Sequence, residues 1–256
     1  MIAAIYNIFD SEELLEGSIK QIRETVDIVI AVVSYTSNNH EHKYTGGRDE
    51  VKRLAKMGLI DHIVEFQPLK GYFPMFNERL KRNEGLKYAI KKGADYFISM
   101  DCDEYYEPDK FAHAYNEIKR LDYDSTVVRM HTYFGEPTLK LEQEEGYFVP
   151  FICKTKIKKS DVVVGNYDCG FYCDPTRKPN NRSKDISRLI KMYHFSWVRK
   201  DRDSYERKMQ YSSAASNIRR IKSSIYDDLA NAAPDRYVAM YKQKLTFTDN
   251  LFNISL

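Results

Sequence analysis

The first part of the chain alternates short apolar runs with segments in which apolar residues recur every three or four positions. The apolar runs are rich in β-branched residues and predict strands. These strands are expected at residues 2–6, 26–35, 62–66 and 96–100. The segments between them predict helices, including two at residues 48–57 and 73–92. Strands and helices in alternation predict a mainly parallel sheet with helices on both faces.

After residue 100 the alternation weakens. A helix is predicted at residues 108–121, and strands are predicted in "STVVRMHTYFG" and "GYFVPFICKTKI". Residues 160–187 contain Gly, Asp, Asn and Pro with little periodicity, which predicts a loop. From residue 201 to residue 256 the pattern is helical and charged. We therefore expect an α/β fold with a mainly parallel central sheet flanked by helices and a helical C-terminal tail.

Composition narrows the class of protein. The chain has 256 residues, which is enough for one domain with a good core. Its apolar share of 43% and its aromatic share of 13% exclude a largely disordered chain. The net charge of +3, from 40 basic and 37 acidic residues, is too balanced to indicate a nucleic-acid-binding protein by itself.

The cysteines and the apolar segments predict where the protein works. Four cysteines in a chain of this length do not form a disulfide framework. The start, "MIAAIYNIFD", resembles a first strand more than an export signal. No stretch reaches the roughly 20 apolar residues of a membrane span. We expect a cytoplasmic protein with reduced thiols and no membrane span.

The stretch "FISMDCDEYYEPD" carries the clearest candidate chemistry. A buried strand ends in Asp101 and Asp103, at the edge of the sheet where ligands bind in parallel α/β folds. In an extended segment, residues two apart point the same way, so both carboxylates can reach one ion. Such oxygen ligands suit Mg²⁺ or Mn²⁺ shared with a substrate phosphate. The alternative is that both aspartates only cap a turn, and a bare Asp-x-Asp favours that alternative.

The surrounding sequence changes that balance. The segment "KRNEGLKYAIKKGADYFISMDCDEYYEPD" resembles the central signature of family 2 nucleotide-sugar glycosyltransferases with the GT-A fold. The N-terminal "IAAIYNIFDSEELLEGSIKQI" is similar to the first strand and helix of that family. The resemblance covers roughly the first 110 residues. It implies a GT-A domain at residues 1–200, followed by a helical extension at residues 201–256. Within the domain, residues 1–104 would bind the nucleotide sugar and residues 105–200 the acceptor.

The resemblance also implies roles for individual residues. Four of them would line the nucleotide pocket or face the diphosphate: Tyr6, Asn7, Arg82 and Asn83. Asp101 and Asp103 would bind the metal and the ribose. One departure is at the end of the second strand, where the family has an Asp for the base and this chain has Ser34, Tyr35 and Thr36. Recognition of uridine therefore does not follow from the resemblance, although a UDP-sugar stays the expected donor.

The segment "KMYHFSWVRKD" holds further candidates. His194 resembles the C-terminal His that serves some GT-A enzymes as a third metal ligand. The alternative is a packing residue among aromatic neighbours. Arg199 and Lys200 are candidates to neutralise the departing diphosphate, and the alternative for both is a solvated helix start.

A catalytic carboxylate is expected in "GNYDCGFYCDPTRK", because irregular loops beside a sheet edge often carry function. Asp168 is preferred there to Asp174 as the base that deprotonates the acceptor, and ordinary turn residues are the alternative. Cys169 and Cys173 lack the spacing of a zinc site and are interpreted as structural.

Together these features predict a metal-dependent glycosyltransferase, inverting as the resemblance implies, that moves a sugar from a nucleotide-diphosphate donor to an acceptor hydroxyl. Mn²⁺ or Mg²⁺ would be the cofactor. The acceptor classes left open are a glycan, a lipopolysaccharide precursor, a protein and modified DNA. Two alternatives are a metal-dependent nucleotidyl- or phosphotransferase, and a noncatalytic carbohydrate- or nucleic-acid-binding module that uses the tyrosines and the basic stretch at residues 199–222.

Overall fold

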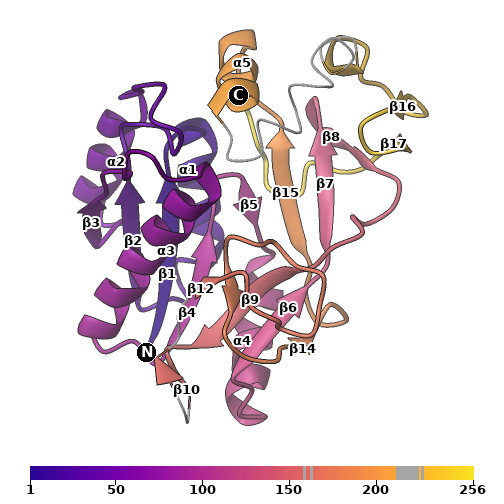
Figure 1. The fold of residues 1–256 in the computed structure, drawn as a ribbon. Helices are drawn as coiled ribbons and strands as arrows, with labels where there is room; N and C mark the ends of the chain where they lie inside the picture. Colours follow the sequence, from indigo (N-terminus) through magenta and orange to yellow (C-terminus); the bar gives the residue numbers. More distant parts are fainter. Residues whose placement is uncertain (158–159, 162–163, 212–224, 226–227) are drawn as a thin grey trace.

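The structure is a computed structural model that describes residues 1–157, 160–161, 164–211, 225 and 228–256. The basic stretch at residues 199–222 and the tail that follows it lie partly outside these residues. Two sheets stand side by side, with the N-terminal half of the chain forming most of one and the second half forming most of the other (Figure 1). No helix in the described part of the chain combines the length and apolar character needed to cross a bilayer.

The first sheet has seven strands in the order β14-β6-β9-β4-β1-β2-β3. Its strands are β1 (Ile2–Ile8), β2 (Ile28–Val33), β3 (His62–Glu65), β4 (Tyr96–Met100), β6 (Ser125–Val128), β9 (Val149–Lys154) and β14 (Lys184–Asp185). Strands β1 to β4 pair in parallel, and β9 runs antiparallel between β4 and β6. The predicted mainly parallel sheet is confirmed.

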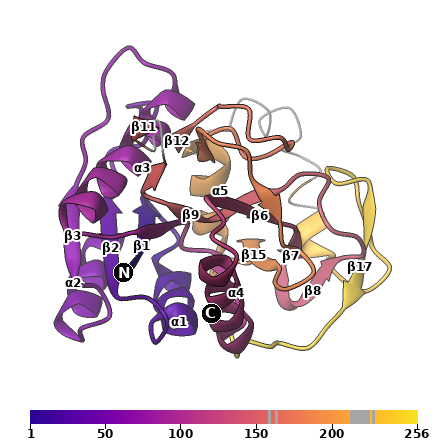
Figure 2. The same ribbon diagram turned by 90° about the horizontal axis from the view of Figure 1, so that it is seen from below.

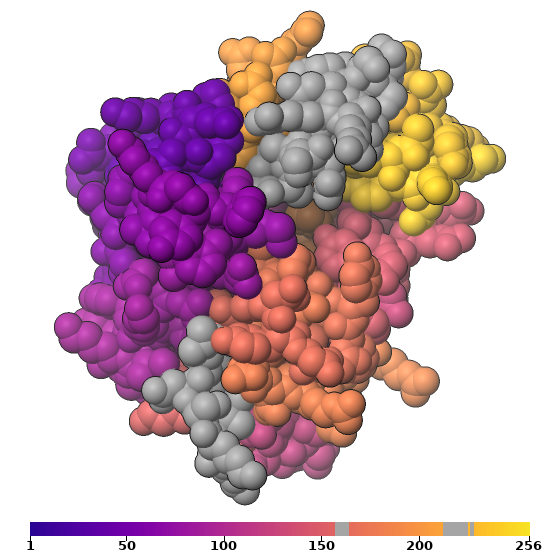
Figure 3. All heavy atoms as spheres, viewed as in Figure 1, coloured from indigo at the N-terminus to yellow at the C-terminus, as the bar shows by residue number. Residues whose placement is uncertain are grey.

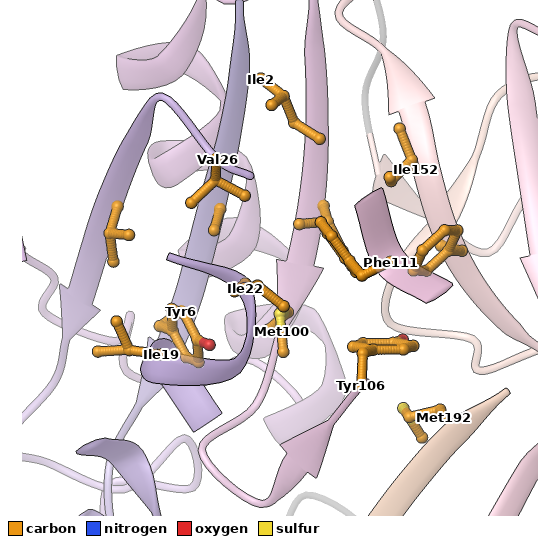
Figure 4. Packing of buried hydrophobic residues seen from close by; sticks show 14 of the residues in the cluster. Ile2, Tyr6, Ile19, Ile22, Val26, Met100, Tyr106, Phe111, Ile152 and Met192 are labelled. Carbon is orange, nitrogen blue, oxygen red and sulfur yellow. The ribbon is translucent and has the colours of Figure 1, made fainter. Parts of the chain in front are cut away.

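Helices cover both faces of this sheet (Figure 2). They are α1 (Glu12–Ile22), α2 (Gly47–Lys56), α3 (Pro74–Lys91) and α4 (Pro108–Arg120). On one face, Tyr6 of β1 and Ile19 of α1 belong to a large core that also contains residues of α2 and α4 (Figure 4). On the other face, Ile5 packs with Leu86 of α3. The alternation of neighbouring residues along β1 therefore separates the two helical layers.

Helix α3 lies unusually close to the sheet at Gly85. A Cβ atom at this position would lie 2.3 Å from Ile5 Cγ2 and 2.7 Å from Val32 Cγ2, so no larger residue fits without movement. This close approach brings the first turns of α3, which carry Glu78 and Arg82, to the edge of the sheet where β1 and β4 end.

The second sheet has six strands in the order β16-β17-β8-β7-β15-β5. They are β5 (Glu104–Tyr105), β7 (Met130–Phe134), β8 (Glu136–Leu141), β15 (Met192–Trp197), β16 (Tyr237–Val238) and β17 (Gln243–Phe247). Because β4 belongs to the first sheet and β5 to the second, residues 101–103 form the link between the sheets. The one strand predicted in "STVVRMHTYFG" is in fact two strands, β6 and β7, which lie in different sheets.

The predicted loop at residues 160–187 contains only strands of two residues. These are β11 (Ser160–Asp161), which pairs with β10 (Lys156–Ile157), and β12 (Val164–Gly165), β13 (Lys178–Pro179) and β14. Residues 162–163 of this loop lie outside the described part of the chain.

The expected helical tail is found in α5 (Arg202–Tyr211), but a helical pattern to the last residue is wrong. Residues 237–238 and 243–247 form β16 and β17 instead. Leu245 is buried opposite Leu141 of β8, while its neighbours Lys244 and Thr246 are more exposed. Pairing with the open edge of β8 decides the structure of this short polar segment, and a helical pattern of charges cannot reveal such a partner. The division of the chain at residue 200 stays a prediction.

Candidate active site

A cleft of ≈ 370 Å³ opens where β1 and β4 end and the chain crosses to the second sheet. Figure 3 shows the surface hollowed where segments from both halves of the chain meet. The lining comes from both sheets, from α3 and α5, and from the C-terminal segment. It consists of Asn7, Phe9, Asp10, Ser11, Asn38, Glu78, Asp101, Cys102, Asp103, Glu145, Tyr147, His194, Ser196, Trp197, Arg199, Lys208, Tyr211, Met240 and Tyr241.

Asp101 is held by side chains of the first half. Arg82 Nη2 donates to both of its carboxylate oxygens, at 3.0 and 2.9 Å, and Asn7 Nδ2 lies 3.3 Å from Oδ1. The Asp101 side chain keeps 31% exposure, so it is anchored from behind and open to the cleft in front.

Arg82 itself is fully buried and is the centre of this anchor. Its Nη1 donates to Ser99 Oγ at 3.0 Å, and its Nη2 also donates to Glu78 Oε1 at 2.8 Å. Glu78 in turn accepts from Thr176 Oγ1 at 3.1 Å, which links α3 to the loop at residues 160–187. A buried guanidinium with this many acceptors is fixed in one orientation.

A second buried ion pair, between Arg177 and Glu104, holds the backbone of the turn at residues 101–103. Glu104 Oε2 accepts from the Asp101 amide at 3.1 Å and from Arg177 Nη1 at 2.9 Å, and Arg177 Nη2 donates to Glu104 Oε1. Arg177 also donates to Ser99 O at 3.0 Å and to Asp174 Oδ2 at 2.9 Å. The loop thereby clamps the turn that carries Asp101 and Asp103.

Asp103 is surrounded by side chains of the second half. Arg199 Nη2 donates to its Oδ2 at 2.8 Å, and Lys208 Nζ of α5 lies 3.6 Å from the same oxygen. His194 Nε2 lies 3.7 Å from Oδ1. Burial alone would raise the pKa of the Asp103 carboxyl, but Lys208, His194 and Arg199 hold that pKa well below its usual range. Asp103 is therefore a carboxylate at every pH at which the protein would work.

His194 reaches the cleft from β15. Burial lowers the pKa of its imidazole, although the nearby Asp103 carboxylate favours the charged form. Its Nδ1 is buried and has no hydrogen-bond partner among the residues that the structure describes. A neutral imidazole is the form that binds metals.

The fit of the predicted metal ligands is partial. Within the described residues, no group of three His, Cys, Asp or Glu side chains is placed to hold a metal ion. Asp103 and His194 do face each other across 3.7 Å, a separation too long for a hydrogen bond. Two such ligands suit Mg²⁺ or Mn²⁺, which takes its other ligands from water and substrate phosphate. Asp101 belongs to a separate hydrogen-bonded set with Arg82.

Of the four residues predicted to bind the nucleotide, two lie at or near the cleft and two lie away from it. Asn7 lines the cleft, and Arg82 lies behind Asp101. Tyr6 is in the core, where its hydroxyl lies 2.9 Å from Ser18 Oγ, because it points to the opposite face of β1 from Asn7. The Asn83 amide pairs with the backbone of Val164, at 2.9 and 3.0 Å, and so fastens β12 to α3. Neither Tyr6 nor Asn83 is among the lining residues.

Two other predicted residues also lie away from the cleft lining. Lys200 is exposed, whereas its neighbour Arg199 is buried and faces Asp103. Asp168 is exposed and accepts from the Gly170 amide at 2.9 Å, which is a turn contact. Their roles in diphosphate binding and in catalysis stay predictions.

The cysteines of the loop pack as a pair. Cys169 and Cys173 are buried, with their sulfur atoms 3.5 Å apart, and belong to a small core with Val127. This packing fits the structural interpretation made from their spacing.

Sequence reasoning missed four charged residues of the cleft. Asp10, Glu78, Glu145 and Lys208 all line it. Glu145 lies in the acidic run "EQEEG" and Lys208 in the charged run "SYERKMQ", where each looks like a solvated residue. Only the contact between segments far apart in the chain distinguishes them.

Comparison with models of known families gives a match over half of the chain. The model of the family described as glycosyl transferase family 2 matches residues 79–207. None of the curated proteins compared with the chain matches it.

Among solved structures, the chain is similar to S. aureus TarS, with 14% identity and a TM-score of 0.37 over 51% of this chain and 22% of that one. A structure of S. aureus TarS 1–349 in complex with UDP-GlcNAc has 13% identity and a TM-score of 0.30 over 52% of this chain and 34% of that one. The chain thus spans about a fifth to a third of the length of these structures.

Proposed function

The chain belongs to glycosyl transferase family 2, and on that premise we propose that it transfers a sugar from a nucleotide-diphosphate donor to an acceptor hydroxyl. A UDP-sugar is the expected donor. The observation that carries the proposal is the carboxylate pair Asp101 and Asp103, which opens into one cleft between the two sheets and is surrounded by cationic side chains.

The two carboxylates would have different tasks. Asp101, fixed by Arg82 and Asn7 and still exposed to the cleft, suits hydrogen bonding to the donor ribose. Asp103 and His194 would hold Mn²⁺ or Mg²⁺. When bound, the ion would neutralise negative charge on the leaving diphosphate.

An inverting transfer needs a base for the acceptor, and we propose Glu145. Its side chain lines the cleft and accepts a hydrogen bond from Thr132 Oγ1, whereas Asp168 is engaged in a turn. The acceptor oxygen forms a bond to the anomeric carbon as the bond to the diphosphate oxygen breaks. The electron pair of that bond leaves with the nucleoside diphosphate, and the acceptor proton passes to Glu145.

The test begins with binding. Thermal unfolding is followed with a panel of UDP-, GDP- and dTDP-sugars, each with Mn²⁺ and with a chelator, because a ligand of the folded state raises Tm. We expect a UDP-sugar to raise Tm in Mn²⁺ and to lose most of that effect in the chelator. A panel without any stabilising nucleotide sugar would contradict the donor class.

Products then define the reaction. Glycans, lipopolysaccharide precursors, proteins and modified DNA are screened as acceptors with the stabilising donor. Release of nucleoside diphosphate supports glycosyl transfer, whereas release of a sugar 1-phosphate, with transfer of the nucleoside monophosphate, would indicate a nucleotidyltransferase. NMR of the product decides whether the anomeric configuration is inverted.

The base assignment has a matched pair of variants. Glu145→Gln is expected to lower kcat by about a hundredfold or more, and Asp168→Asn to leave it within about twofold of the wild type. The reverse result would restore Asp168 as the base.

A further inference from the structure

Lys208 of α5 lines the cleft beside Asp103. Its side chain is only 15% exposed, and its ammonium lies 3.6 Å from Asp103 Oδ2 and 5.5 Å from the centre of the Trp197 ring. The distance to Asp103 is longer than a hydrogen bond. Lys208 thus forms an ion pair with Asp103 but no hydrogen bond to it.

Asp103 does not depend on Lys208 for a partner. Arg199 already donates to Oδ2 at 2.8 Å, and it is fixed further by hydrogen bonds to Ser196 O and to Ser11 Oγ. Two cations therefore share one carboxylate oxygen, and only Arg199 is bound tightly. A lysine ammonium at the end of a flexible stem is the cation of the pair that can move.

A divalent cation at Asp103 would repel an ammonium at this distance. Asp10 and Asp101 also act on Lys208 from within the cleft, and a bound donor adds the negative charge of its diphosphate. Lysine is a common phosphate-binding residue, so the diphosphate suits it as a new partner. Arg199 has two acceptors besides Asp103, Ser196 O and Ser11 Oγ, and stays in place.

We propose that Lys208 exchanges partners in the catalytic cycle: it faces Asp103 in the ligand-free cleft and binds the donor diphosphate once a divalent cation occupies Asp103. The proposal rests on the proposed function and adds to it a second cation for the leaving group, supplied by α5. It predicts opposite effects of Lys208 on the two ligands. Lys208 opposes the binding of the metal ion alone and favours the binding of the nucleotide.

The test uses Lys208→Met, which keeps the apolar stem and removes the charge, and Lys208→Arg, which keeps the charge. Lys87→Met is the control, because Lys87 is 71% exposed on α3 and is not among the cleft residues. Calorimetry measures the Kd of Mn²⁺ without nucleotide and the Kd of UDP in saturating Mn²⁺. Thermal unfolding checks that each variant folds.

We expect Lys208→Met to bind Mn²⁺ several-fold more tightly and UDP about tenfold more weakly than the wild type. Lys208→Arg should retain most of the affinity for UDP, and Lys87→Met should match the wild type in both titrations. Weaker binding of both ligands by a folded Lys208→Met protein would show a merely structural lysine and overturn the exchange. Unchanged constants would overturn it as well.

Failure of the proposed function gives a different result. If the wild-type protein binds no Mn²⁺, the proposed metal site at Asp103 and His194 is wrong, and so is the proposed exchange. If no UDP binds even with Mn²⁺ bound, the proposed donor class is wrong. Normal binding of both ligands by the wild type, with no opposite shifts in Lys208→Met, overturns the exchange alone.

Discussion

Asp101 and Asp103 are two residues apart, yet they belong to different parts of the molecule. Asp101 is held by Arg82 of α3 and by Asn7 of β1, which are elements of the first half. Asp103 is held by Arg199 and faced by His194 and Lys208, which all come from the second half. The Asp-x-Asp segment therefore lies at the junction of the two halves. The environments of its two carboxylates form only when both halves are folded.

The two environments also differ in how their charges are fixed. The partner of Asp101 is a fully buried arginine whose two terminal nitrogens also donate to Ser99 and Glu78, so its orientation is fixed. Of the three basic groups near Asp103, only Arg199 is within hydrogen-bond distance of the carboxylate. We infer that Asp101 positions the donor, whereas Asp103 exchanges its contact with Lys208 for a metal ion.

The largest difference should appear when each aspartate is changed to asparagine. Asp103→Asn is expected to weaken Mn²⁺ binding by about a thousandfold, because the amide keeps the shape and loses the charge. Asp101→Asn should leave the Mn²⁺ affinity within several-fold of the wild type while weakening UDP binding. Calorimetry with each ligand measures both effects. Equal losses of Mn²⁺ affinity in the two variants would mean that both aspartates bind the ion.

The next largest effect should be the loss of stability when the Arg177–Glu104 pair behind Asp101 is broken. Arg177→Met leaves the buried Glu104 carboxylate without its partner and is expected to lower the free energy of unfolding by about 3 kcal/mol. Lys87→Met breaks an exposed pair with Glu84 and should cost at most about 0.5 kcal/mol. Urea denaturation compares the two variants. A small loss for Arg177→Met would show that the loop at residues 160–187 is not fastened through this pair.

Much of the fold could be predicted from local patterns, and the reason is visible in the first half. Strands and helices up to residue 121 follow from apolar periodicity, and β4 has the predicted bounds. In the second half, β6 and β7 were predicted as one strand, because a pattern of β-branched residues does not show that Arg129 separates two sheets. The strand β17 was missed because its partner, β8, is about a hundred residues away.

The residues of the candidate site were also predicted only in part. Asp101 and Asp103 stood out because a costly pair of carboxylates ends a buried strand. Tyr6 was assigned to the nucleotide pocket together with Asn7, but neighbouring residues of a strand point to opposite faces, so only Asn7 reaches the cleft. The sequence did not reveal the partners of Arg177 and Lys208, since Glu104 and Asp103 are distant from them along the chain.

A smaller effect should distinguish the first half by its response to pH. Lys81 is 1% exposed and donates to Ile8 O, and burial lowers the pKa of its ammonium to about 7. The unfolded lysine titrates near 10.4, so between about pH 7 and pH 10 the unfolded state binds a proton that the folded state lacks. The wild type should therefore gain stability as the pH rises through this window.

Lys81→Met removes that dependence. The variant is expected to be more stable than the wild type at pH 7 by about 2 kcal/mol, after allowing for the lost hydrogen bond to Ile8, and the gap should close toward pH 10. Urea denaturation at several pH values gives the comparison. A variant less stable than the wild type at pH 7 would mean that the contact with Ile8 outweighs the cost of burial.

The second half should respond in a different window, through His131 of β7. Burial and then the nearby Lys140, with a smaller effect of Lys191, lower the pKa of its imidazole to about 4, against the opposing attraction of Glu144. The unfolded histidine titrates near 6.5, so the stability that the neutral ring contributes is complete above that pH and is lost as the pH falls from about 6.5 to 4. His131→Gln should remove about 1 kcal/mol of this loss, because the ring is only partly buried. Chemical denaturation at pH 7 and pH 4.5 measures it, with Lys81→Met as the control that should keep the acid-side loss. Identical losses in His131→Gln and the wild type would place the acid sensitivity elsewhere and leave the two halves without separate titration windows.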